Sequence, residues 1–141
     1  MEPTEITDEL PDLELFDPSE KTCLIIDDFE FEKANKATAR KLSTLFRFVS
    51  SHRNLSIMCG YQSWFDCPSI ARKCANCYLI YKPNGHLELS NIANRCGMSP
   101  DDMHEIFANV CNGTYDSLMV DKTIGTPAPL RKNVFQVIEV S

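Results

Sequence analysis

The sequence predicts an α/β fold with a mainly parallel sheet flanked by helices. Apolar runs alternate with segments of helical spacing, which is the order of elements in α/β proteins, and the runs lie at 22–26, 55–60 and 76–81. The first run is almost continuously apolar, as in strands that are buried on both faces. It ends in Asp27 and Asp28. Because ligands of such sheets bind beyond the carboxyl ends of the strands, these two acids mark a candidate site.

The composition is that of one globular domain. The chain has 141 residues, of which 43% are hydrophobic and 24% are charged. These ordinary values argue against disorder and against a fibrous repeat. The net charge is −6, and this field repels nucleic acid at a distance. Any contact with DNA therefore requires a local basic surface, for which the lysines and arginines between Lys33 and Arg53 are candidates.

The cysteines and the amino terminus predict an intracellular protein. Seven cysteines form an odd set, and four of them lie in apolar surroundings, as buried free thiols do: Cys23, Cys59, Cys77 and Cys111. We expect no disulfides. No apolar run approaches the roughly 20 residues that a membrane span requires, and the acidic amino terminus lacks the features of a signal peptide.

The first half of the chain is predicted to contain a strand, a helix and a second strand. Residues 1–21 form a polar approach segment whose few apolar groups are expected to dock on the body, and residues 22–141 form the domain. An amphipathic helix is predicted over 32–51 from the helical spacing of its apolar residues. The strand over 55–60 then places Gln62 just beyond its end.

The second half is predicted from its turn and capping residues. A short helix over 68–73 begins with a proline, and a strand over 76–81 stops at a Pro-Asn-Gly turn. Further helices are expected over 87–95 and 99–110, and further strands over 117–120 and 134–140. Ser99 and Pro100 are typical of a helix start, and Gly97 is typical of the end of the helix before it.

Asp27, Asp28 and Gln62 are the groups best placed for chemistry. In a P-loop NTPase, an acid at the tip of a buried strand holds Mg²⁺, usually through water, and a second acid beside it polarises the attacking water. An acid in this position also commonly caps the next helix. The amide of Gln62 suits a hydrogen bond to that water or to a phosphate oxygen, and equally suits a loop residue facing solvent.

Other residue sets suggest weaker alternatives. Arg53 and Arg72 are candidates for neutralising phosphoryl charge, although a surface ion pair is the commoner role of an arginine. A set of Cys67, Cys74 and Cys77 with Cys96 or His86 would supply four zinc ligands. A single C-x-x-C is poor support for zinc. A cysteine nucleophile paired with His52 or His104 lacks the orienting third group that such catalysis needs.

In this order and spacing, the chain resembles the genome-packaging ATPases of large DNA viruses, of the poxvirus type, and of virus-like transposons. These form a branch of the FtsK/HerA superfamily of P-loop NTPases. The segments that carry the resemblance are Leu10–Leu13, Leu24–Asp28, Ser51–Ser56, Tyr61–Phe65, Arg72 with Asn76, Tyr78–Lys82, Tyr115–Asp121 and Leu130–Phe135. They span nearly the whole chain.

The resemblance implies a partial RecA-like P-loop NTPase domain that uses ATP and Mg²⁺. Asp27 would be the Walker B acid that holds Mg²⁺ through water, and Asp28 the catalytic acid. Gln62 would sense the γ-phosphate, and all three residues would contact the nucleotide. Arg72, with Asn76 behind it, occupies the place of the family's basic motif, for which a finger reaching a neighbouring subunit is one interpretation.

The resemblance also implies a motor that translocates double-stranded DNA into a capsid. Its partners would be DNA, capsid or packaging proteins, and other copies in a homo-oligomeric ring, with no membrane involved. It would work in the cytoplasm or nucleus of a virus-infected host cell, or in the virion.

The sequence departs from the family in one respect. It contains no phosphate-binding loop of the form G-x-x-x-x-G-K-[ST], and no glycine is followed by lysine. The sheet is therefore expected to lack its first strand and to expose an apolar edge, and the chain is not expected to hydrolyse ATP alone. It would be a fragment, one half of a split gene product that needs an amino-terminal half, or a decayed copy. An inactive module of the same ancestry that serves in assembly, and an unrelated α/β binding domain, are the competing hypotheses.

Overall fold

A computed structural model of the chain describes residues 6–7, 9–30 and 35–139. The chain divides into two compact units, each with its own sheet. Unit 1 comprises Met1–Gln62 and Asp66–Cys74, and unit 2 comprises Ser63–Phe65 and Ala75–Ser141. No helix in the described part of the chain is both long and apolar enough to cross a membrane.

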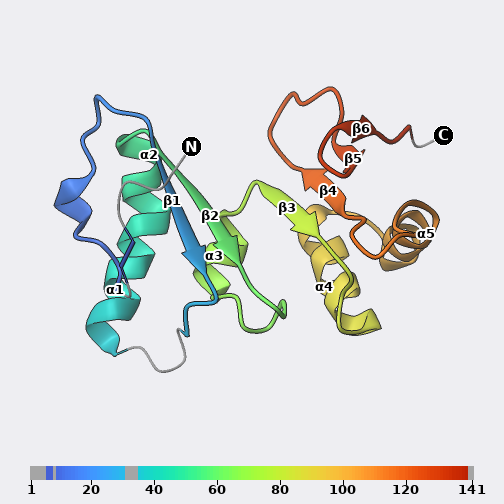
Figure 1. Ribbon diagram of the computed structural model, residues 1–141, viewed down its shortest axis with the longest axis horizontal. Coiled ribbons are helices and arrows are strands. Elements are labelled where there is room, and N and C mark those ends of the chain that lie inside the picture. The colour runs from blue at the N-terminus through green and yellow to red at the C-terminus, as the bar shows by residue number, and fades with distance from the viewer. Residues whose placement is uncertain (1–5, 8, 31–34, 140–141) are drawn as a thin grey trace. The chain divides into compact units, whose positions relative to one another are not determined.

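Unit 1 is built on two parallel strands, β1 (Thr22–Asp27) and β2 (Leu55–Gly60), shown in Figure 1. Parallel strands need a crossover connection, and a continuous helical segment supplies it. This segment consists of α1 (Lys36–Thr44), the π-helical turn η3 (Leu45–Val49) and α2 (Ser50–His52). The helix predicted over 32–51 is confirmed from Lys36 onward, and residues 32–34 lie outside the described part.

The crossover helix and the approach segment enclose the core of unit 1. Apolar side chains from the helix and from one face of the strands form a single buried cluster: Phe16, Ile26, Leu42, Leu45, Val49 and Leu55. The buried ring of Phe16 follows the short 3-10 helix η1 (Leu13–Leu15). Arg53 Nη1 donates hydrogen bonds to the carbonyls of Leu13 and Phe16, at 3.2 and 3.0 Å. The approach segment therefore docks on the body as predicted, and the contacts of Arg53 are structural.

The other face of the parallel pair is open. Ile25 and Met58 lie opposite each other in the register and are 68% and 59% exposed. Parallel sheets are ordinarily covered on both faces. The prediction that the first strand is buried on both faces is therefore wrong for this structure. The exposed apolar surface extends over a face, where the sequence predicted one at an edge.

Unit 2 contains an antiparallel sheet in the order β3 (Cys77–Ile80), β4 (Leu118–Asp121), β5 (Leu130–Lys132) and β6 (Gln136–Val137). The α/β class is confirmed, but the parallel part is smaller than predicted, because β3 pairs antiparallel with β4. The strand predicted over 134–140 is wrong in its bounds. Asn133 and Val134 have left-handed φ angles of 50° and 73°, and they turn the chain between β5 and β6. Residue 140 lies outside the described part.

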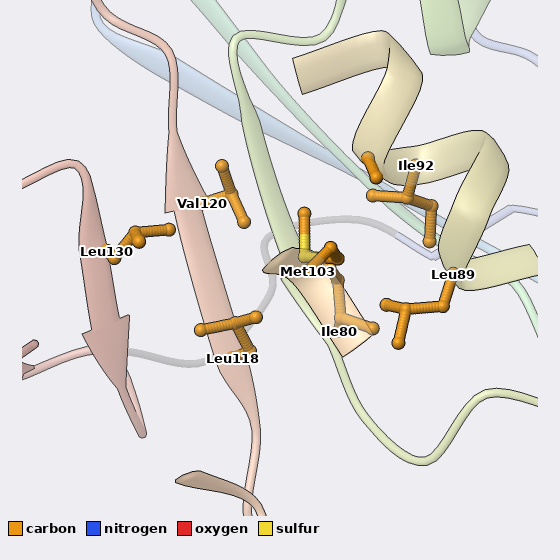
Figure 2. Close-up of a cluster of buried hydrophobic side chains, with 8 residues drawn as sticks. Ile80, Leu89, Ile92, Met103, Leu118, Val120 and Leu130 are labelled. Carbon is orange, nitrogen blue, oxygen red and sulfur yellow. The ribbon is translucent and has the colours of Figure 1, made fainter. Parts of the chain in front are cut away.

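The helices of unit 2, α4 (His86–Cys96) and α5 (Pro100–Val110), begin and end as predicted, within a residue. Gly97, with φ of 73°, ends α4, and the Ser99 side chain accepts the amide of Asp102 at the start of α5. Both helices pack on the sheet through the cluster drawn in Figure 2: Ile80, Leu89, Ile92, Ala93, Met103, Leu118, Val120 and Leu130.

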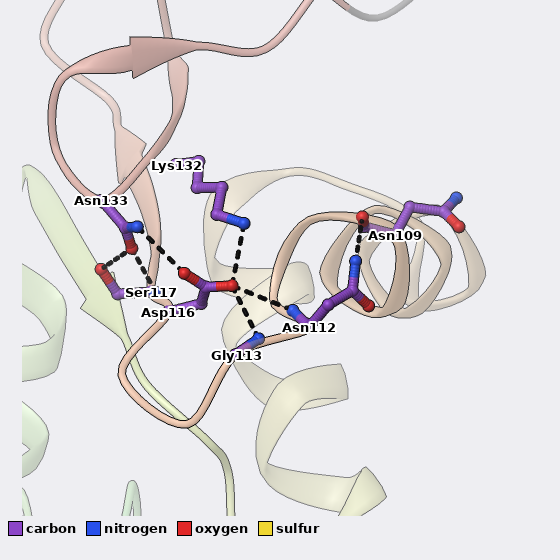
Figure 3. A network of polar contacts seen from close by, with 7 residues as sticks. All are labelled: Asn109, Asn112, Gly113, Asp116, Ser117, Lys132 and Asn133. Atoms are coloured by element: carbon purple, nitrogen blue, oxygen red, sulfur yellow. Dashed lines mark hydrogen bonds and ion pairs between the residues drawn. The ribbon is translucent and has the colours of Figure 1, made fainter.

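One carboxylate fastens the loop after α5 to β5. Asp116 Oδ2 accepts hydrogen bonds from the amides of Asn112 and Gly113 and from Lys132 Nζ, while Oδ1 accepts from Asn133 Nδ2 (Figure 3). These contacts hold the pKa of the Asp116 carboxyl well below its ordinary value, chiefly through the hydrogen bonds from Lys132 and Asn133.

All seven cysteines are free thiols, as predicted. Their burial differs from the prediction, since Cys23 and Cys77 are exposed. Both lie on strands whose residues alternate between covered and open faces, so an apolar neighbourhood in the sequence did not mean burial.

Candidate functional site

The carboxyl ends of β1 and β2 place the predicted site residues at one edge of the parallel pair. Asp27 is the last residue of β1 and lies opposite Gly60, the last residue of β2. The Asp28 amide donates to the Gly60 carbonyl at 3.0 Å, which extends the ladder by one residue. Both carboxylates are exposed.

Gln62 and Asp28 are in direct contact. Gln62 Nε2 donates a hydrogen bond to Asp28 Oδ2 at 2.8 Å. The amide therefore turns toward the acid beside it, which is the geometry that a water-orienting pair requires, because both groups then face one reacting atom. An amide that merely faced solvent would not have this partner.

Asp28 occupies a left-handed backbone conformation, with φ of 50°. Only Gly, and less often Asn and Asp, adopt this region without a large steric cost. Strained residues of this kind concentrate at functional sites, where the surrounding structure holds them in place. The outlier thus lies at the residue that the sequence singles out.

Gly60 is a site residue that the sequence reasoning missed. A Cβ atom at this position would lie 2.7 Å from Asp27 Oδ1, a separation that no real side chain tolerates. Glycine therefore leaves the space that the Asp27 carboxylate occupies. A glycine at the end of an apolar strand is a known sign of close approach and was the available signal.

The side chains behind the site are neutral. Burial raises the pKa of the Tyr61 phenol far above its ordinary value, and it raises the pKa of Cys59 to about 12 and of Cys67 to about 11. Reactive cysteines have lowered pKa values because the thiolate is the nucleophile. Cys59 and Cys67 are therefore inert thiols at neutral pH.

Arg72 lies in α3 (Ser69–Cys74) and is half-buried. Its charge acts on the Cys67 thiol, where it partly offsets the effect of burial on the pKa. Asn76 belongs to the other unit, where its carbonyl accepts the amide of Lys122 at 2.7 Å. The structure joins Asp28 to Gln62 by a hydrogen bond and gives Arg72 a place in the same unit.

The donor set fits magnesium better than zinc. Among the described residues, no group of three or more His, Cys, Asp or Glu side chains is arranged to hold a metal ion. The predicted zinc ligands are thus not assembled in this structure. Mg²⁺ in nucleotide sites is held by one or two carboxylates together with phosphate oxygens and water. Asp27 and Asp28 meet that requirement, since both carboxylates are exposed and Gly60 leaves room beside Asp27.

Comparison with known proteins gives a structural match only. No protein-family model matches the sequence, and the comparison with curated proteins gives no match. Among solved structures, the chain is similar to the genome packaging NTPase B204 from Sulfolobus turreted icosahedral virus 2, solved in complex with ATP-gammaS. The TM-score is 0.54 at 18% sequence identity, over 86% of this chain and 53% of that chain. The two proteins share a fold.

This match confirms the predicted fold class, a partial RecA-like α/β domain. The chain spans about half the length of the packaging NTPase that it matches. The parallel pair with its crossover helix is the part of such a domain that bears Asp27 and Asp28.

Proposed function

We propose that this chain is part of an ATP-driven motor that moves double-stranded viral DNA into a capsid. The hydrogen bond from Gln62 to Asp28, beyond the ends of two parallel strands, carries this proposal. The similarity to a viral packaging NTPase with a bound ATP analogue supports it.

The site residues have distinct tasks in this proposal. Asp27, at the tip of β1, holds Mg²⁺ through water, and the ion neutralises charge on the phosphates when bound. Asp28 accepts a proton from the attacking water or polarises it, and the Gln62 amide orients that water or the γ-phosphate. Gly60 keeps the space beside Asp27 clear.

A second polypeptide or segment completes the site. The sequence contains no phosphate-binding loop, so the backbone amides and lysine that hold the β- and γ-phosphates must come from elsewhere. The exposed face with Ile25 and Met58 supports such a partner, because a parallel sheet of this family is covered on both faces. We propose that the segment with the loop packs on this face.

Assembly into a ring would bring Arg72 to a neighbouring nucleotide. Charge from a neighbouring subunit accelerates phosphoryl transfer in many NTPases. The ring would enclose DNA and contact capsid or packaging proteins, in the infected cell or the virion. The local basic residues must provide the DNA contact, given a net charge of −6.

A catalytically inactive assembly module is the second candidate. The missing loop motif favours it, since the chain alone lacks the phosphate-binding groups. The test is ATP turnover by the chain mixed with a candidate loop-bearing polypeptide, with and without double-stranded DNA. Turnover that DNA stimulates supports the motor. Association of the two polypeptides without turnover supports the inactive module.

A further inference from the structure

Glu88 is a buried carboxylate in the first turn of α4. Its side chain is 7% exposed and accepts three hydrogen bonds. Oε1 accepts from the Ser63 hydroxyl and from the Trp64 amide, the latter at 3.2 Å, and Oε2 accepts from the Asn84 amide at 2.9 Å. Burial alone would raise the pKa of this carboxyl, but the three hydrogen bonds lower it below its ordinary value. Glu88 is therefore an ionised acceptor at neutral pH.

The two oxygens of Glu88 serve different parts of the chain. Oε2 reaches back to the residue before the N-cap of α4, which is an ordinary helix-capping contact. Such a cap needs one oxygen and no burial: α1 and α5 are capped by the side chains of Asn35 and Ser99, and Asn35 is exposed. Burying a charge is costly unless every contact is used. The second oxygen, which holds a distant turn, therefore needs a separate explanation.

That turn begins at the residue after Gln62. Ser63 Oγ donates to Glu88 and also accepts the Phe65 amide at 3.2 Å, so the turn is fixed at both ends. The Trp64 ring packs with Tyr78, at 5.9 Å between ring centroids, and joins the core of unit 2. The chain on the carboxyl side of Gln62 is thus held by side chain, backbone and ring contacts.

We propose that Glu88 is a positioning residue for Gln62. By fixing Ser63 and Trp64, it fixes the backbone from which the Gln62 amide reaches Asp28. The amide then exchanges Asp28 for water or phosphate by rotation of its side chain alone, without a backbone search. This inference rests on the proposed function for the task of Gln62, but the contact between Gln62 and Asp28 is tested without it.

The first test reads the Gln62 side-chain amide by NMR in the full chain without nucleotide. Asp28→Ala gives the reference position of an amide that lacks its carboxylate partner. Ser63→Ala removes one donor to Oε1 and leaves the Asn84 cap intact, and Glu88→Gln replaces one acceptor oxygen. We expect both to move the Gln62 resonance toward the reference position. Ser99→Ala, which removes the cap of α5, should leave it unchanged.

The outcomes separate positioning from helix capping. A Gln62 resonance that stays at the wild-type position in a folded Ser63→Ala chain overturns the proposal. Ser63→Ala also covers the case in which Glu88→Gln does not fold. An equal shift in Ser99→Ala would show a general loss of order in unit 2 and would overturn it as well.

The second test measures turnover in the mixture with the loop-bearing polypeptide. Ser63→Ala should lower kcat about tenfold, because misplacement of a water-orienting group acts on the chemical step, and should leave KM for ATP unchanged. An unchanged kcat overturns the positioning role. If the wild-type mixture shows no turnover while Ser63→Ala still shifts the Gln62 amide, the proposed function fails and the positioning role stands.

Discussion

Gln62 Nε2 lies 2.8 Å from Asp28 Oδ2, although 34 positions separate the two residues in the chain. The contact follows from the register of the parallel strands, which sets Asp27 opposite Gly60. Each strand is followed by a polar residue within two positions, and both strands end at the same edge. A one-residue slip of the register would turn every side chain to the other face and separate the pair.

Asp28→Gly is expected to keep or raise the stability of the isolated chain. Glycine relieves the left-handed backbone at φ of 50°, and the lost hydrogen bond is exposed. We predict a free energy of unfolding that is equal or higher by about 0.5–1 kcal/mol, measured by urea denaturation. A loss of more than about 1 kcal/mol would show that the carboxylate contributes more to the fold than the strained backbone costs.

The sequence predicted the parallel unit well because its signals were local. The acids after the first strand, the amphipathic crossover helix and Gln62 after the second strand each stand beside the element that positions them. Strand order alone then brought the side chains together. The hydrogen bond itself is a prediction that only the register makes possible.

The second unit was predicted less well because its pairing is not local. The run at 76–81 has the same apolar character as the first two strands, yet β3 pairs antiparallel with β4, about forty residues later. The left-handed turn at Asn133 and Val134 carries no glycine, so no turn signal marked the division between β5 and β6. Glu88 was missed because its partners lie 24 and 25 positions earlier.

Gly60→Ala should disable the site without unfolding the chain. The new Cβ would meet the Asp27 carboxylate at 2.7 Å and displace it, but Asp27 is exposed and free to move. We predict a stability change within about 1 kcal/mol and a loss of turnover in the mixture of at least about tenfold. Gly85→Ala is the matched control, since nothing lies within 4 Å of its Cβ. Full turnover in Gly60→Ala would contradict the role given to Asp27.

Ile25→Glu tests the exposed face of the parallel pair. The side chain is 68% exposed, so the isolated chain should lose no more than about 0.5 kcal/mol of stability. A buried charge at an interface is costly, and we predict that the affinity for the loop-bearing polypeptide falls at least about a hundredfold in a titration calorimetry experiment. Ile124→Glu is the control, because Ile124 is fully exposed in unit 2. Equal affinities for both variants would remove this face from the interface.

Asp116→Asn should weaken the chain at neutral pH and less so in acid. The folded-state pKa of Asp116 is lowered, so its contribution is fully present above the unfolded pKa of about 3.9 and is lost as the pH falls below it. We predict a lower Tm than wild type at pH 7 and a difference that narrows below about pH 4. Glu105→Gln, at an exposed position of α5, should show neither effect. A constant difference across this range would mean that the charge of Asp116 is not what stabilises the loop.

The most direct test of the account is magnesium-dependent ATP turnover by the chain mixed with the loop-bearing polypeptide, measured for wild type, Asp28→Asn and Gln62→Ala. Asp66→Asn is the matched control, because it removes an exposed acid of the same unit outside the site. We predict turnover only in the mixture, abolished by Asp28→Asn, strongly reduced by Gln62→Ala and unchanged by Asp66→Asn. Turnover that survives Asp28→Asn, or that the chain shows without its partner, would contradict the assignment of Asp28 and Gln62 as the water-orienting pair of a site completed in trans.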